Sequence, residues 1–414
     1  MTMRRTDVAI IGAGQAGLAM SACLTARGIE HVVLERGRVA ERWRHGSWDS
    51  LRLLTPNWLS ELPGLRYAGP DPHGYMTKDE YIAYLTDYAA TFAAPVIGDA
   101  EVRRVTHGGA HYCVETRGGA WRVTALVVAT GQCEAPCIPP VAQQLSPYFH
   151  QLHAAQYRSP HALPEGGVLI VGASASGLQI AEELHQAGRH VTLSSGSHTR
   201  LPRHYRGRDI MWWLDRLGIL DDRRVDVPDL GDAHRQPSLQ IVGRRAPSLD
   251  LALLRQAGVR VMGRAITACR TAVDFANDLA ASTAAAEHKL ARMLERIDRG
   301  IHERGIRAGA PEPHAPVLLD APASRIDLAA SGVRTVIWAT GYRPRYPWLD
   351  VPVLDRRGDL VEDGGMTAAP GLYVLGLRWL RRRSSSFITG TGRDAHELAR
   401  EVASFVGRRQ VKVA

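Results

Sequence analysis

The chain has 414 residues, 45% of them hydrophobic and 22% charged, which is typical of a globular protein of two or three domains. No apolar run approaches the ~20 residues of a membrane helix, and the N-terminal stretch lacks the hydrophobic region of a signal peptide, so we expect a cytoplasmic protein without a membrane partner. The net charge of +9 is spread along the chain and only 6% of residues are aromatic, which argues against a nucleic-acid partner.

The first glycine-rich turn stands near the N-terminus. A strand over 7–11, a turn, a helix over about 14–27 and a strand over 31–35 follow one another in the stretch that contains "IGAGQAGLAMSACL". This order matches the dinucleotide-binding fingerprint, with glycines for the tight turn, the pyrophosphate and the packing of helix on strand, and an acid for a ribose hydroxyl. The residues in these roles are Gly12, Gly14, Gly17 and Glu35.

Between the two glycine-rich turns the pattern is less regular. The segment 41–64 is rich in Trp, Pro and Gly, and a loop of this length inside a domain is often functional. The segment 77–92 is amphipathic and predicts a helix, and short strands around 101–128 lead into "ALVVATGQ" at 125–132.

The second turn repeats the first. A strand over 167–171, a helix to about residue 187 and a strand over 190–194 surround "VGASASG", and an apolar strand near 333–338 again ends in Ala-Thr-Gly. The residues expected at this second nucleotide site are Gly172, Ser174, Ser176 and Gly177. Serine is tolerated in such a turn wherever the backbone is not left-handed. The chain therefore contains a duplicated βαβ unit, and predicts two dinucleotide sites.

The residues after each turn distinguish the two nucleotides. Glu35 suits an unphosphorylated ribose such as that of FAD, whereas no acid follows the second strand. Hydroxyl groups and arginines stand there instead, which suits the 2′-phosphate of NADPH. The candidates are Ser195, Arg200 and Arg203, and a solvated basic loop is the alternative interpretation.

Other residues are less informative. Three residues separate Cys133 from Cys137, one more than the two of a redox-active CxxC pair, and no metal-binding constellation is present. An Ala-, Leu- and Arg-rich segment over about 275–305 predicts a helix that either packs one apolar face or shapes a substrate site.

Taken together, these motifs resemble the class B flavin-dependent monooxygenase superfamily over nearly the whole chain. The resemblance implies an α/β protein with two three-layer, Rossmann-like domains, in which an NADPH domain (156–325) is inserted into a discontinuous FAD domain (1–155 and 326–414). It assigns further residues near FAD, namely Arg36, Trp43, Gly131 and Gly376, and a linker motif at Ala339, Thr340 and Gly341.

The chain also departs from the family. His153 and Tyr157 match the fingerprint between the domains, but Pro147 and Phe149 replace its Phe and Gly. Thr55 and Asn57 are candidates for a polar catalytic position near the flavin, although Asn57 is also a typical turn residue after a proline.

The resemblance implies a reaction as well. NADPH reduces FAD, O2 forms a C4a-(hydro)peroxyflavin, and one oxygen atom enters a small organic substrate. Nitrogen or sulfur oxygenation is slightly favoured over Baeyer–Villiger-type attack on a carbonyl. A thioredoxin-reductase-like flavoprotein and a flavin-binding sensor without turnover remain as alternatives, and a homodimer is compatible with the sequence.

Overall fold

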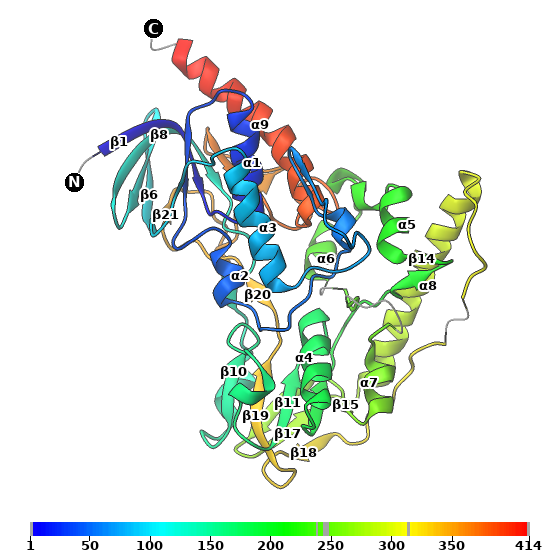
Figure 1. The fold of residues 1–414 in the computed structure, drawn as a ribbon. Helices are drawn as coiled ribbons and strands as arrows, with labels where there is room; N and C mark the ends of the chain where they lie inside the picture. Colours follow the sequence, from blue (N-terminus) through cyan, green and yellow to red (C-terminus); the bar gives the residue numbers. More distant parts are fainter. Residues whose placement is uncertain (1–2, 237–238, 243–247, 313–314, 412–414) are drawn as a thin grey trace.

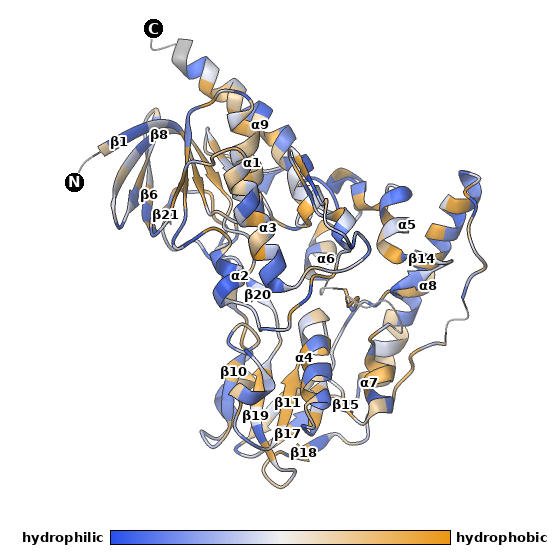
Figure 2. Ribbon diagram, in the orientation of Figure 1, coloured by the Kyte–Doolittle hydropathy of each residue, from blue (hydrophilic) through white to orange (hydrophobic). Residues whose placement is uncertain are grey.

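In the computed structural model, which describes residues 3–236, 239–242, 248–312 and 315–411, the chain forms two α/β bodies joined side by side (Figure 1). The domain ends predicted at residues 1 and 414 lie outside these ranges. Each body has a central sheet of apolar strands covered on both faces, so both are three-layer structures (Figure 2).

The first body is built on a ten-stranded sheet with the order β21-β6-β7-β8-β1-β2-β5, to which β22, β23 and β24 are attached. Strand β1 runs parallel to β2 and β8, while β6, β7 and β8 form an antiparallel meander. The strands are β1 (Met3–Ile11), β2 (His31–Leu34), β5 (Val96–Ile97), β6 (Val102–Gly108), β7 (His111–Thr116), β8 (Gly119–Val128), β21 (Leu349–Asp350), β22 (Glu362–Asp363), β23 (Met366–Thr367) and β24 (Leu372–Val374).

Helices cover one face of this sheet and the meander folds over the other. The helices are α1 (Gln15–Thr25), α3 (Lys78–Thr91) and α9 (Ile388–Val411), with the short α2 (Glu41–His45) beside them. Apolar residues on the helix side form one core cluster, and those on the opposite face, including Ile11 and Leu34, form another. The helix predicted over 77–92 is α3, which begins with a capping box between Thr77 and Glu80.

The second body is built on a fully parallel five-stranded sheet with the order β10-β19-β11-β12-β15. Its strands are β10 (His150–His153), β11 (Gly167–Val171), β12 (Val191–Ser194), β15 (Arg260–Met262) and β19 (Val333–Trp338). Helices α4 (Ala175–Gln186) and α7 (Leu251–Ala257) pack on one face. The antiparallel strands β16 (Ala265–Cys269), β17 (Ala272–Phe275) and β18 (Arg325–Asp327) pack on the other.

Smaller elements join the two bodies. The helices are α5 (Ile210–Arg216), α6 (Leu230–Arg235) and the long α8 (Leu279–Glu303). The short paired strands are β3 (Glu61–Leu62) with β4 (Leu65–Arg66), β9 (Ala135–Pro136) with β20 (Tyr342–Arg343), and β13 (His204–Tyr205) with β14 (Arg208–Asp209).

The domain boundaries drawn from the sequence need one correction. Strand β10 lies within the predicted first segment 1–155, and β19 lies within the predicted last segment 326–414, yet both pair in the second sheet. The reason is the duplication itself. The strand that ends in Ala-Thr-Gly pairs beside the strand that carries the glycine-rich turn, as β8 does beside β1 and β19 beside β11.

The segment predicted as a helix over about 275–305 also begins later than expected. Residues up to Phe275 belong to β17, and helix α8 begins at Leu279. Its residues Leu290, Ile297 and Ile301 pack in one apolar cluster with α5, so the helix has a packing role in this structure.

Candidate dinucleotide sites

The first glycine-rich turn connects β1 to α1. Gly12 has φ +105°, and a side chain there would approach the carbonyl oxygen of Ala129 to 2.8 Å. A side chain at Gly17 would overlap the carbonyl oxygen of Gly12, whereas one at Gly14 would meet no atom within 4 Å. Gly12 and Gly17 are thus required for packing, and Gly14 borders open space.

The N-terminus of α1 is available to an anion. Its N-cap, Gly14, provides no side-chain cap, and its first turn contains no acidic residue. Unsatisfied amide groups and the helix dipole at such an end favour a phosphate group. The turn therefore offers open space and hydrogen-bond donors of the kind that a phosphate group requires.

Glu35 is fixed next to this turn. It follows β2 and is buried, and its carboxylate accepts hydrogen bonds from the amides of Ala13 (2.6 Å) and Gly37 (3.2 Å). The two amides fix the carboxylate in one orientation beside the turn.

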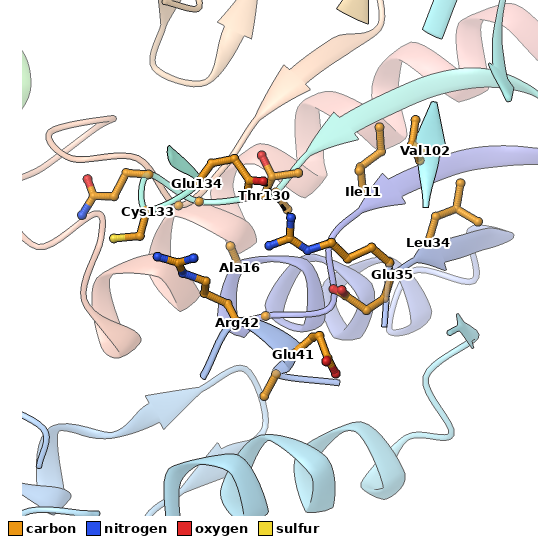
Figure 3. Close-up of a pocket in the computed structure, with 18 of the residues that line it drawn as sticks. Ile11, Ala16, Leu34, Glu35, Glu41, Arg42, Val102, Thr130, Cys133 and Glu134 are labelled. Carbon is orange, nitrogen blue, oxygen red and sulfur yellow. Dashed lines mark hydrogen bonds and ion pairs between the residues drawn. The ribbon is translucent and has the colours of Figure 1, made fainter. Parts of the chain in front are cut away.

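These residues line a cavity of about 470 Å³ (Figure 3). Leu34, Glu35 and Val102 lie towards one end, and Arg42 and Cys133 lie towards the other. The cavity brings together seven of the eight residues predicted to bind FAD, which are Gly12, Gly14, Glu35, Arg36, Trp43, Gly131 and Gly376. The eighth, Gly17, packs beneath the turn.

The lining also contains residues that sequence reasoning missed. Glu134 forms a 2.7 Å ion pair with Arg36, and Gln15, Arg42, Arg345 and Ser386 contribute further polar groups. Glu134 lies between the two cysteines of "CEAPC". The charged residue of that segment, and not only the spacing of its cysteines, therefore indicated a polar site.

The second turn reproduces the geometry of the first. Gly172 has φ +108° and packs against the carbonyl of Ala339, as Gly12 packs against that of Ala129. A side chain at Gly177 would overlap the carbonyl oxygen of Gly172. Ser174 is the N-cap of α4 at φ −79°, an ordinary extended conformation, and Ser176 lies in the first turn of that helix. The serines therefore fit the turn without strain.

Comparison with known proteins agrees with this geometry. Residues 9–212 match the family model described as pyridine nucleotide-disulphide oxidoreductase. An uncharacterised CzcO-like oxidoreductase of Geobacillus kaustophilus is 34% identical over 400 residues, which cover 96% of this chain and 98% of that protein. An indole-3-pyruvate monooxygenase of Oryza sativa, YUCCA1, is 35% identical over 224 residues, about half of each chain.

The chain belongs to the family of the CzcO-like oxidoreductases, and it has the fold of a flavin-containing monooxygenase. Among solved structures, a flavin-containing monooxygenase from Stenotrophomonas maltophilia superposes with a TM-score of 0.67 at 23% identity, covering 97% of this chain and 99% of that one. Bacillithiol disulfide reductase from Bacillus cereus superposes with a TM-score of 0.61 at 17% identity, with the same coverage. These two likenesses confirm the fold, and the family implies a flavin and a nicotinamide cofactor.

The arginines predicted to bind phosphate are engaged elsewhere in this flavoprotein. Arg200 is 5% exposed and forms ion pairs with Asp250 (3.1 Å) and Glu287. Arg203 is 1% exposed and donates to Asp209 and to the carbonyl of Leu54, both at 2.8 Å. The structure does not present either guanidinium group at an open site, since binding a phosphate would require these ion pairs to break.

Ser195 is also enclosed in this structure. Its side chain is buried and donates to the carbonyl of Gly196, and its amide donates to Met262. The role of Ser195 at a nicotinamide phosphate stays a prediction.

The two catalytic candidates, Thr55 and Asn57, do not line the cavity at the first turn. Asn57 is buried, donates to the carbonyl of Asp71 (2.9 Å) and accepts from the amide of Met76 (2.8 Å). Its amide group therefore holds the loop 71–76, and Asn57 itself begins the 3₁₀ turn Asn57–Leu59 directly after Pro56. Thr55 is half-buried two residues earlier.

His153 has a structural role at the connection between the bodies. Its Nδ1 accepts from the amide of Ala155 (3.1 Å), so Nε2 donates to the carbonyl of Gly341 (3.0 Å). Burial lowers the pKa of His153, which keeps the ring neutral. The hydrogen bond to Gly341 connects the linker motif Ala339, Thr340 and Gly341 to the end of β10. Thr340 also donates to the carbonyl of Cys137.

Cys133 lines the cavity and is a free thiol, as is Cys137. Burial raises the pKa of Cys133, with Arg42 and Arg378 opposing that effect. The thiol is therefore protonated at neutral pH, which makes it a poor nucleophile.

Within the described ranges, no helix is long and apolar enough to cross a membrane.

Proposed function

We propose that this protein is an FAD- and NADPH-dependent monooxygenase that inserts one oxygen atom of O2 into a small organic substrate. Oxygenation at nitrogen or sulfur is favoured over Baeyer–Villiger-type attack on a carbonyl. The observation that carries the proposal is the cavity at the first turn. The glycine turn, the fixed carboxylate of Glu35 and a second group of polar residues all line this one cavity.

The residues of the cavity fit FAD part by part. The open side of Gly14 and the uncapped start of α1 would hold the pyrophosphate, and Glu35 would accept from a ribose hydroxyl. The far end, with Arg42, Cys133 and Ser386, would then border the isoalloxazine ring. The bound flavin, once reduced, supplies the activation of O2.

The second turn would hold the nicotinamide cofactor. Its geometry repeats the first, and α4 again begins without a side-chain cap or an acid in its first turn. Because Arg200 and Arg203 are paired inside the protein, we assign the 2′-phosphate to Arg264. The Arg264 side chain is 66% exposed, lies beside Gly196 after β12, and is 3.6 Å from Asp278.

Incorporation of ¹⁸O tests the reaction directly. The purified flavoprotein is turned over with NADPH and ¹⁸O2 on a panel of amines, thioethers, ketones and α-keto acids, and products are analysed by mass spectrometry. We expect one ¹⁸O atom per product and a greater rate on an amine or a thioether than on any ketone. Stoichiometric release of hydrogen peroxide without labelled product, on every substrate, would overturn the proposal.

A matched variant addresses the reductase alternative. Replacing both Cys133 and Cys137 by serine removes the one cysteine in the described lining of the cavity, Cys133, together with the other cysteine of "CEAPC". A monooxygenase should keep its rate of labelled-product formation, within about twofold. Loss of NADPH turnover with retention of FAD would favour a thioredoxin-reductase-like enzyme.

A further inference from the structure

A second cavity, of about 330 Å³, lies apart from the flavin site and shares no lining residue with it. Its walls come from three places in the chain: Trp58 before β3, residues 73–75 before α3, and the β13–β14 hairpin with the first residues of α5. Its volume falls within the range of small-molecule pockets. The lining residues are Trp58, His73, Tyr75, His204, Gly207, Arg208, Asp209 and Trp212.

Three aromatic rings form the apolar part of this cavity. The Tyr75 ring is fixed, because its hydroxyl donates to Asp209 (2.6 Å) and the Arg203 guanidinium stacks over its face at 4.8 Å. The Trp212 ring packs edge-on against Trp213 at 4.7 Å. Rigid, flat side chains of this kind bind planar aromatic ligands with little loss of conformational entropy.

The carboxylate in the lining is not available to a cation. Oδ1 of Asp209 accepts from Arg203 (2.8 Å) and from the amide of Met211 (2.7 Å), and Oδ2 accepts from Tyr75. Glu312, which is outside the lining, uses its two oxygens on the amides of Arg206 and Gly207. Both of these carboxylates are therefore bound to protein donors.

Arg208, the arginine in the lining, is not engaged by a described residue of opposite charge in the way that Asp209 is. Arg208 is exposed and stacks on the Trp212 ring at 5.2 Å, and no carboxylate in the described part of the chain lies within ion-pair distance of it. His204 and His73 stand at the same opening and offer further donors. A guanidinium group above an aromatic wall binds a carboxylate while the wall binds the ring that carries it.

We propose that this cavity binds a small planar aromatic carboxylate, with the ring between Trp58, Tyr75 and Trp212 and the carboxylate on Arg208. The site is separate from the flavin cavity, so binding there does not depend on oxygenation.

Three compounds of the same size and different charge test the proposal: indole-3-acetate, indole-3-acetamide and tryptamine. Binding to the oxidised, flavin-loaded protein is measured by calorimetry without NADPH. We expect indole-3-acetate to bind about fivefold more tightly than the amide, and tryptamine to bind most weakly. Equal affinities, preference for tryptamine, or no binding of any of the three would overturn the proposal.

Two variants locate the binding. Arg208→Gln should abolish the preference for the acetate over the amide, and Trp212→Leu should weaken both compounds. The control is Arg216→Gln, because Arg216 is exposed at the end of α5, the helix that carries Trp212, and is not part of the lining. Unchanged binding in Arg208→Gln, with flavin content intact, would place the acetate elsewhere and reject the site.

The same measurement with saturating NADP⁺ separates this cavity from the nicotinamide site. An unchanged affinity for indole-3-acetate supports a separate site, and displacement by NADP⁺ would overturn it. Since none of these experiments uses turnover, they fail or succeed independently of the monooxygenase reaction.

Discussion

At the level of single residues, arginine is the type whose role the sequence least determines. Arg200 and Arg203 follow the second strand as a phosphate-binding pair would, yet each is buried against carboxylates. Asp250 and Glu287 lie 50 and 87 residues further along the chain from Arg200, so no local pattern reveals them. The position after the second strand predicts an arginine at the phosphate site. Tertiary contacts decide which arginine is accessible to the phosphate.

Removing Arg200 tests whether it is structural. Arg200→Ala leaves Asp250 and Glu287 without their buried counter-charge, so we expect the free energy of unfolding to fall by about 3–5 kcal/mol. Urea denaturation of the flavin-loaded protein measures this loss. A variant of unchanged stability that binds NADPH much more weakly than NADH would return Arg200 to the phosphate site.

Arg264 is expected to behave differently, because it is exposed. Arg264→Gln should weaken NADPH binding roughly tenfold and NADH binding within twofold, without loss of stability. Flavin reduction at varied nicotinamide concentration gives both affinities. Arg260→Gln, at an exposed position on β15, is the matched control. An equal effect of Arg264→Gln on the two cofactors would remove Arg264 from the phosphate site.

At the level of elements, the two βαβ units agree closely with the sequence. The strand over 167–171 is found at the predicted residues, and the helices α1 and α4 end within two residues of their predicted ends. Strand β1 starts four residues earlier than predicted, because Met3 to Thr6 pair with β8. That extension depends on a distant partner, and the local hydrophobic pattern does not contain it.

Two of the three glycines of the first turn, Gly14 and Gly17, should have separable effects. Gly14→Ala meets no atom within 4 Å, so the protein should fold with normal stability and lose most of its FAD. Gly17→Ala overlaps the Gly12 carbonyl and should destabilise the fold by about 1–3 kcal/mol. Flavin content by absorbance and thermal unfolding of the flavin-free protein distinguish the two. The same loss of stability in both variants would contradict this assignment of roles.

At the level of the whole molecule, the two bodies are connected by ion pairs as well as by the chain. Asp222, beside α5, accepts from Arg383 (2.8 Å) in the segment before α9 and pairs with Arg296 of α8 (2.5 Å). Arg393 of α9 pairs with Asp221 at 2.5 Å. These contacts hold the C-terminal segment of the first body against the helices that extend from the second sheet, and they involve arginines to which the sequence gives no local partner.

This connection should depend on pH through Asp222. Burial alone would raise its pKa, but the hydrogen bonds and charges of Arg296 and Arg383 outweigh burial and lower the pKa below its ordinary value. A lowered folded-state pKa means that the stabilisation is complete above the unfolded pKa and is lost as the pH falls through the folded one. Asp222→Asn should therefore cost about 1–2 kcal/mol of unfolding free energy at about pH 7.

The same substitution should cost less at a second, acidic pH below the ordinary carboxyl pKa, because the stabilisation by Asp222 is progressively lost as the pH falls towards its lowered folded-state pKa. Urea denaturation of both proteins at the two pH values measures the difference. Asp226→Asn is the control, since Asp226 is exposed close by in the chain and should show no such pH dependence. A gap between Asp222→Asn and the unaltered protein that is as large at low pH as at neutral pH would mean that shape at this position, rather than the charge of Asp222, holds the two bodies together.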